Sequence, residues 1–178
     1  MSASERKAVK RRNQMKKKVW IGIGLVVAAI AWYAFRPELL FVNKSVSESF
    51  PSTVAANTSD SAASPKPLAS GQFKGYAHET QGNAGIYGVN SKRVLRLTDF
   101  KTSNGPDVHV YLVAAPDVKD DATVKKAGFI DLGSMKGNMG DQNYDVPESA
   151  DLRKYQAVTI WCARFNVNFG TAPLTANN

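Results

Sequence analysis

The sequence predicts an all-β fold, an antiparallel β-sandwich of about seven strands, preceded by one N-terminal transmembrane helix and a flexible linker. Residues 71–178 contain short segments of alternating apolar and polar residues, separated by Gly, Asn, Asp and Pro, a pattern typical of strands and turns. No helical period of useful length lies between these segments, which favours a sandwich over an α/β fold. A separate uncharged apolar run at residues 19–35 predicts the helix.

The first 18 residues form a basic head. Eight of the 23 Lys and Arg residues lie there with one acidic residue, a net charge of 8 − 1 = +7. The other 160 residues carry 15 basic and 14 acidic side chains, a net charge of +1. A nucleic-acid-binding domain needs clustered positive charge on its folded part, so the charge distribution excludes nucleic acid as a partner.

Residues 19–36 are expected to form a signal-anchor helix, because 17 uncharged residues span roughly 26 Å as a helix. Trp20 lies at one end of the run and Trp32 and Tyr33 at the other, as in membrane-interface belts. Basic flanks stay in the cytoplasm. We therefore expect a single-pass protein of the plasma (inner) membrane, with its N-terminus cytoplasmic and its C-terminal domain periplasmic or extracellular.

A cleaved signal peptide is the alternative, because Ala29-Ile30-Ala31 resembles a cleavage site. Against cleavage, the apolar segment continues through Trp32 and Tyr33. Both interpretations export the C-terminal part of the chain.

Residues 37–70 are expected to be a juxtamembrane segment and a disordered linker. Of the 26 residues at 45–70, 18 are Ser, Thr, Ala or Pro, and Phe50 is the single aromatic residue. Such a composition buries too little apolar surface to offset the entropy of ordering the chain. A flexible tether should therefore connect the anchor to the exported domain at 71–178.

The expected strands of this domain follow from alternation between turn signals. Residues 81–85 and 104–107 are expected to be turns, 133–140 a glycine-rich hairpin, and 117–127 a loop or a short helix. The seven strands are expected at 73–80, 84–89, 93–100, 108–114, 129–132, 143–146 and 156–169.

Cys162 is the most informative candidate site residue. Since it is the only cysteine, an intrachain disulfide and a multi-cysteine zinc or iron–sulfur site are excluded. From residue 157 onward the odd positions form an apolar core face, and the even positions change from apolar to polar at Cys162. We expect Cys162 near the edge of a buried patch, with Arg164 on the same strand face, where its charge favours the reactive thiolate. The alternative is an inert cysteine that acts as a small hydrophobic residue.

His109 is the second candidate. It shares a predicted strand face with Asp107 and Tyr111, so Asp107 could orient the imidazole and leave the other nitrogen for a metal or haem iron. The alternative is a solvated strand face. Met135 and Met139 in the glycine-rich hairpin could ligate haem together with a histidine, but packing within the loop is the favoured interpretation.

The domain resembles the DM-thirteen family, also called electron-transfer DM, in its membrane-anchored single-domain form. An ordered set of short motifs carries the resemblance across residues 71–174. These motifs include Leu95-Arg96-Leu97-Thr98-Asp99-Phe100, Gly105-Pro106-Asp107-Val108-His109-Val110-Tyr111-Leu112, Gly140-Asp141-Gln142-Asn143-Tyr144 and Ile160-Trp161-Cys162.

The resemblance implies a β-rich domain outside the cytoplasm with an electron-transfer or oxidative role at cell surfaces. It places Cys162 at the position of the family's single cysteine, which is proposed to act as a bare thiol or as a ligand for a group such as haem. In a cofactor-binding role, Trp161 would pack beside Cys162, and His109 and Asp107 would be secondary candidates. The cofactor would be haem, or the thiol would act without one.

The leading hypothesis is thus a membrane-anchored redox module that acts through Cys162 with a redox or envelope protein partner. The rival is a non-redox binding or adhesion domain, in which Cys162 is structural and exposed loops such as 133–140 contact a partner. A catalytic oxidoreductase has the least support, because no acid–base pair or nucleophile–base set can be assigned.

Overall fold

The computed structural model describes residues 3–35, 42–51, 67–89 and 91–177. It divides into two units, one ending at Pro37 and one beginning at Glu38. Residues 52–66, the middle of the expected linker, lie outside the described residues, as do residues 36–41.

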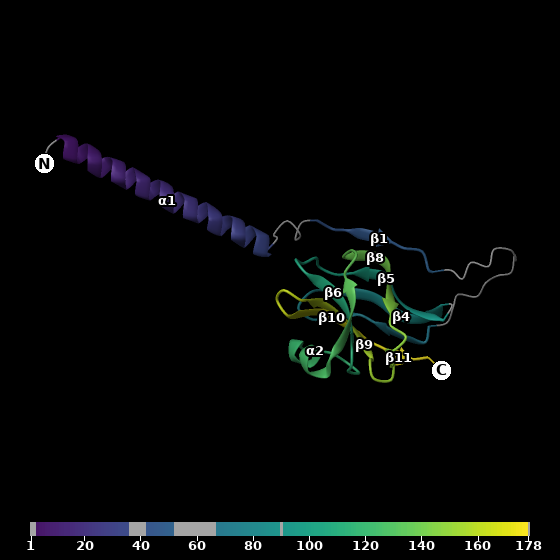
Figure 1. Cartoon of the computed structure of the whole chain (residues 1–178). Coiled ribbons are helices and arrows are strands. Elements are labelled where there is room, and N and C mark those ends of the chain that lie inside the picture. The colour runs from purple at the N-terminus through teal and green to yellow at the C-terminus, as the bar shows by residue number, and fades with distance from the viewer. Residues whose placement is uncertain (1–2, 36–41, 52–66, 90, 178) are drawn as a thin grey trace. The chain divides into compact units, whose positions relative to one another are not determined.

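The first unit is a single helix, α1, which spans Ala3–Phe35 (Figure 1). It begins inside the basic head and contains the whole expected apolar run. The segment Gln14–Ala34 is long and apolar enough to cross a membrane, and none of it is buried within the protein. An apolar helix with no protein surface to cover it is typical of a membrane span, although a signal sequence has the same length and composition.

The second unit contains two β-sheets and one short helix, α2 (Asp121–Ala127). The all-β prediction for this domain is confirmed. The first sheet has the strand order β1 (Ser45–Ser47), β8 (Met139–Val146), β5 (Lys92–Lys101), β4 (Gln81–Val89), β2 (Ala69–Gln72) and β11 (Thr175–Ala176). The second has the order β3 (Lys74–Gly75), β10 (Val167–Pro173), β9 (Ala157–Cys162), β6 (Val108–Val113) and β7 (Phe129–Ser134). Neighbouring strands are antiparallel, except that β1 runs parallel to β8.

The main hydrophobic core includes buried side chains from both sheets. Ile86 and Leu95 of the first sheet belong to the same cluster as Val110 and Ile160 of the second. A second cluster lies on the other face of β6 and β9, where α2 contributes Val124. Both faces of β9 are therefore buried, which explains why its sequence is apolar almost throughout.

Three local expectations differ from the structure. Residues 81–85 begin β4 instead of forming a turn, and Gly82 (φ +111°) provides a bulge opposite β5. Only the short strand β3 forms within residues 73–80. The long strand expected at 156–169 is a hairpin, β9–β10, whose turn at 163–166 contains Asn166 at a φ of 56°.

The expected linker is ordered at its start. Residues 42–51, which we call the strap, lie against the first sheet, and β1 within them pairs with β8 in the register Ser45↔Met139 to Ser47↔Asp141. Val46, Glu48 and Phe50 alternate with serines, a strand-like pattern inside a composition that otherwise predicts disorder. The strap forms one edge of the first sheet, where β1 lies beside β8 (Figure 1).

Candidate functional site

Cys162 lies in the core between the two sheets. It is the last residue of β9, where it pairs with Val108 of β6 and Val167 of β10. Its exposed fraction is 1%, and it belongs to the main hydrophobic cluster. The next residues form the turn at 163–166, of which residues 164–166 are exposed. The thiol is thus enclosed in this conformation but lies at a strand end beside an exposed turn.

Arg164 does not share a strand face with Cys162, because β9 ends at the cysteine. Arg164 is exposed in the turn at 163–166, where the chain reverses into β10. The alternation used to place both side chains on one face holds only while a strand continues. The expectation that Cys162 and Arg164 share one strand face is therefore wrong.

Trp161 belongs to the second cluster, on the face of β9 opposite to Cys162. Its ring stacks on Tyr111 with a centroid distance of 6.2 Å, and Tyr111 stacks on Phe129 at 4.1 Å. Since Phe129 is 43% exposed, this aromatic series runs from the buried indole to the surface. Trp161 adjoins Cys162 in the chain, but the two side chains pack in different clusters.

His109 contacts two carboxylates at the edge of the same aromatic series. Its Nε2 lies 3.1 Å from Asp107 Oδ1, and its Nδ1 lies 2.9 Å from Asp131 Oδ2. Partial burial disfavours the charged imidazole, but hydrogen bonds and charges from Asp131 and Asp107 outweigh that effect and raise the pKa of His109. The contact with Asp107 was expected. Asp131, which is 22 residues away in sequence, was not, and no local spacing indicates it.

The candidate residues do not fit a haem or a metal ion in this arrangement. Cys162 faces the inter-sheet core, whereas both nitrogens of His109 on the opposite face are hydrogen-bonded to aspartates. Met135 packs against the core and Met139 begins β8. Among the described residues, no group of three His, Cys, Asp or Glu side chains is arranged to hold a metal ion. The structure thus brings His109, Asp107 and Trp161 to one face of the sheet and leaves Cys162 on the other.

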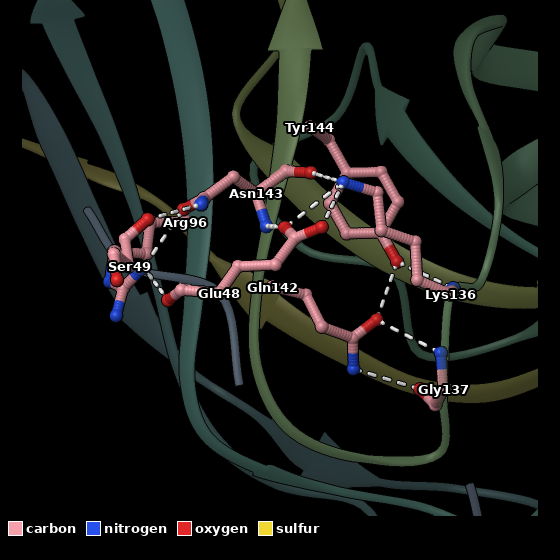
Figure 2. Close-up of polar contacts among 8 residues, drawn as sticks. All are labelled: Glu48, Ser49, Arg96, Lys136, Gly137, Gln142, Asn143 and Tyr144. Atoms are coloured by element: carbon pink, nitrogen blue, oxygen red, sulfur yellow. Dashed lines mark hydrogen bonds and ion pairs between the residues drawn. The ribbon is translucent and has the colours of Figure 1, made fainter. Parts of the chain in front are cut away.

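A second polar site, which sequence reasoning missed, joins the strap to the domain (Figure 2). The Glu48 carboxylate accepts hydrogen bonds from Lys136 Nζ at 2.8 and 3.0 Å and from the Asn143 backbone N–H at 2.7 Å. Arg96 donates to the Glu48 backbone oxygen at 3.0 Å. Burial disfavours charge on Glu48, but the hydrogen bonds from Lys136 and Asn143 and the charges of Lys136 and Arg96 together lower its pKa.

Beneath this site, a buried hydrogen-bond network holds the hairpin that joins β7 to β8. The Tyr144 hydroxyl donates to Gln142 Oε1 at 2.7 Å and accepts from the Lys136 backbone N–H at 3.0 Å. Gln142 also pairs with the backbone of Gly137 in both directions. Burial raises the pKa of Tyr144 to about 12. The hairpin expected to be an exposed contact loop is therefore partly buried and lies beside the strap.

An open cleft of about 720 Å³ lies beside the strap. Glu48 and Pro51 of the strap form part of its lining, together with Lys92, Val94, Leu132 and Asp145 of the domain. None of the residues predicted to carry redox chemistry lines it. The cleft and the predicted site are thus separate features of the domain.

Comparison with known proteins identifies the domain. Residues 72–174 match the family model described as Electron transfer DM13, which spans more than half of the chain. No curated protein and no solved structure matches the chain significantly. The match includes Cys162, Trp161, His109 and Asp107, whereas the strap with Glu48 precedes it. The chain therefore belongs to the electron transfer DM13 family.

Proposed function

We propose that the protein is a single-pass membrane protein that holds an electron-transfer domain outside the cytoplasm. The apolar part of α1 would cross the plasma (inner) membrane, with the basic head in the cytoplasm and the sandwich in the periplasm or extracellular space. The charge asymmetry supports this orientation, since eight basic residues precede the apolar run. A reporter fused after Asn178 tests the topology, because activity only in the cytoplasm would contradict export.

Cys162 is the redox group in this proposal, and it reacts through local opening of the domain. Its position as the last residue of β9 carries the proposal, because separating the turn at 163–166 from the sheet end would uncover the thiol without unfolding the core. In the opened state Arg164, two residues away, would favour the thiolate. A redox or envelope protein partner that carries a disulfide would then react with this thiolate. A sulfur–sulfur bond forms between Cys162 and one partner sulfur, the partner's own disulfide breaks, and its other sulfur leaves as a thiolate.

His109, Asp107 and Trp161 have a supporting role in the proposal. The imidazole joins β6 to β7 through Asp131 and also contacts Asp107. Asp107 lies beside the turn, where its backbone oxygen accepts from Ala163 N–H at 2.8 Å. Asp107 thus connects the histidine to the residue that follows Cys162. We infer that this cluster limits how readily the strand end opens.

A second candidate is a non-redox binding or adhesion domain with a structural cysteine. The exposed fraction of only 1% for Cys162 favours it, because a thiol packed in hydrocarbon is inert. Exposed surface such as the stacked Phe129 ring would then contact the partner.

Thiol reactivity of the full-length chain separates the two candidates. The rate of alkylation is measured at increasing urea concentration, with Ser149→Cys in a Cys162→Ser background as the exposed control. A rate that exceeds the global unfolding rate and depends weakly on urea supports local opening and the redox module. A rate that follows global unfolding throughout refutes the gated thiol and leaves the binding domain.

A further inference from the structure

The contacts of the strap are specific for an extended backbone beside β8. The Glu48 backbone N–H donates to the Asp141 oxygen at 3.0 Å, and the Met139 N–H donates to the Lys44 oxygen at 3.3 Å. Asn138 accepts from the Lys44 N–H at 2.7 Å. These bonds join residues more than 90 positions apart in sequence, so they hold the start of the expected tether on the folded domain.

Two glycines make room for this backbone. A Cβ atom at Gly137 would lie 2.3 Å from the Lys44 carbonyl oxygen, and one at Gly140 would lie 2.1 Å from the Val46 oxygen. No side chain fits at such distances, so the strap occupies a groove that only glycine permits at these positions. The groove is thus shaped for the main chain of residues 44–46.

The Glu48 carboxylate provides the charged part of the contact. Lys136 bonds both of its oxygens, and the Asn143 N–H bonds one of them. Further along, Asn143 Nδ2 donates to the Ser49 oxygen at 2.9 Å, and the Phe50 ring packs edge-on against Tyr87 with a centroid distance of 5.0 Å. One carboxylate therefore connects the strap to both the hairpin and β8, between the strand pairing on one side and an aromatic contact on the other.

We propose that the strap is a releasable attachment that gives the membrane tether two lengths, an inference that rests on the proposed anchoring by α1. With the strap docked, the chain between Phe35 and Val42 limits the domain to at most about 25 Å from the helix end. With the strap released, the chain between Phe35 and Pro67 spans at most about 110 Å. The docked state thus keeps an electron-transfer domain close to the membrane surface, and the released state lets it reach a more distant partner.

The charged groups around Glu48 determine how docking depends on pH. Lys136 contacts its carboxylate, Arg96 lies at its backbone oxygen and pairs with Asp141, and Lys92 and Asp145 line the adjoining cleft. The pKa of Glu48 is lowered from its ordinary value of 4.5, so its contribution is complete above that value and is lost as the pH falls through the lowered pKa. Docking is therefore stable at neutral pH and weakens in acid.

Hydrogen exchange of the full-length chain tests the docking. In Glu48→Gln the charge is lost and the side-chain amide faces the Lys136 ammonium, so we expect exchange of the Lys44 and Glu48 amides to accelerate about tenfold or more. Asp145→Asn is the matched control, since Asp145 lines the same cleft and its side chain has no hydrogen bond or ion pair among the described residues. Lys136→Gln removes the basic partner of Glu48 and should accelerate the same exchange, whereas Lys92→Gln, at another lysine that lines the cleft, should not. Equal protection in Glu48→Gln and Asp145→Asn would overturn the proposal.

The tether length is measured in lipid nanodiscs. A donor dye at Ser149→Cys, in a Cys162→Ala background, transfers energy to an acceptor on the lipid headgroups. We expect weaker transfer with Glu48→Gln than with Asp145→Asn, and equal transfer would refute the two lengths. A chain that does not associate with nanodiscs refutes the anchor instead, and the exchange measurement still tests the docking by itself.

Discussion

Cys162 and Trp161 are consecutive in β9, yet their side chains belong to hydrophobic clusters on opposite faces of the sheet. The indole stacks with the buried ring of Tyr111 in the second cluster, and the thiol packs between the sheets. Alternation along a strand makes this separation unavoidable for neighbouring residues. A redox role for Cys162 therefore depends on motion at the strand end, and Trp161 affects it only through the backbone.

Substituting Cys162 separates its packing role from its polarity. Cys162→Ala should lower the free energy of unfolding by about 1 kcal/mol, because it removes one buried atom from the core. Cys162→Ser should cost more, about 1–3 kcal/mol, because it buries a hydroxyl group among apolar side chains. Urea denaturation followed by tryptophan fluorescence measures both. A serine variant as stable as the alanine variant would indicate that water reaches the side chain at position 162, which contradicts its burial in the structure.

The His109 cluster should give the domain a pH-dependent stability. Since the pKa of His109 is raised above its ordinary value of 6.5, its charged contacts contribute fully below that pH and are lost as the pH rises through the raised pKa. The effect should stay below about 1 kcal/mol, because the cluster is partly exposed. Melting temperatures between pH 5 and pH 9 should fall less in His109→Gln than in the native chain. If the melting temperatures of the two proteins changed with pH in the same way, the contacts of His109 with its aspartates would not contribute to stability.

Gly140→Ala should detach the strap while leaving the sandwich folded. The new methyl group would collide with the Val46 carbonyl oxygen, and Gly140 also has a φ of +92°. Gly133→Ala is the control, because Gly133 has a φ of +113° but no atom lies within 4 Å of its added Cβ. Hydrogen exchange should therefore accelerate at Lys44 and Glu48 in Gly140→Ala only. Acceleration in both variants would point to backbone strain in the hairpin instead of a blocked groove.

Tyr144→Phe tests the buried network beneath the strap. It removes a hydroxyl group that bonds Gln142 and the Lys136 N–H, so one buried and one partly buried group lose a partner. We therefore expect the free energy of unfolding to fall by about 1–3 kcal/mol. Tyr155→Phe serves for comparison, because Tyr155 is half-buried and its hydroxyl has no hydrogen bond among the described residues. Chemical denaturation should give Tyr144→Phe a clearly lower free energy of unfolding than Tyr155→Phe. Equal stabilities would mean that water replaces the tyrosine hydroxyl.

Alternation and turn signals in the sequence were sufficient to predict most strands of the sandwich, because strands such as β8 alternate buried and more exposed residues. β4, β5, β6, β7 and β8 all overlap their expected positions. The hairpin at 163–166 was missed because Ala163, Arg164 and Phe165 carry no turn signal, and both faces of β9 are buried. An apolar run buried on two faces has no period from which its end can be inferred.

The site was harder to predict than the fold, because its contacts join residues far apart in the chain. Asp107 could be matched to His109 by spacing, but Asp131 reaches it only through the pairing of β6 with β7. Glu48 lies in a serine-rich segment, and its partners Lys136 and Asn143 follow about 90 residues later. Composition predicted disorder for the strap, and a few strong tertiary contacts override composition over short stretches.

Thiol–disulfide exchange at Cys162 in the full-length, membrane-embedded chain is the decisive experiment for the redox role of this thiol. The chain is equilibrated in glutathione buffers of varied ratio, in which the Cys162 thiolate attacks glutathione disulfide, forms a mixed disulfide and releases one glutathione thiolate. Mass spectrometry gives the fraction of mixed disulfide, with Val110→Ala as a core variant that keeps the thiol. We expect reversible formation of the mixed disulfide at Cys162 in the native chain and in Val110→Ala, and none in Cys162→Ala. A thiol that stays reduced at every glutathione ratio until the domain unfolds would contradict the redox role.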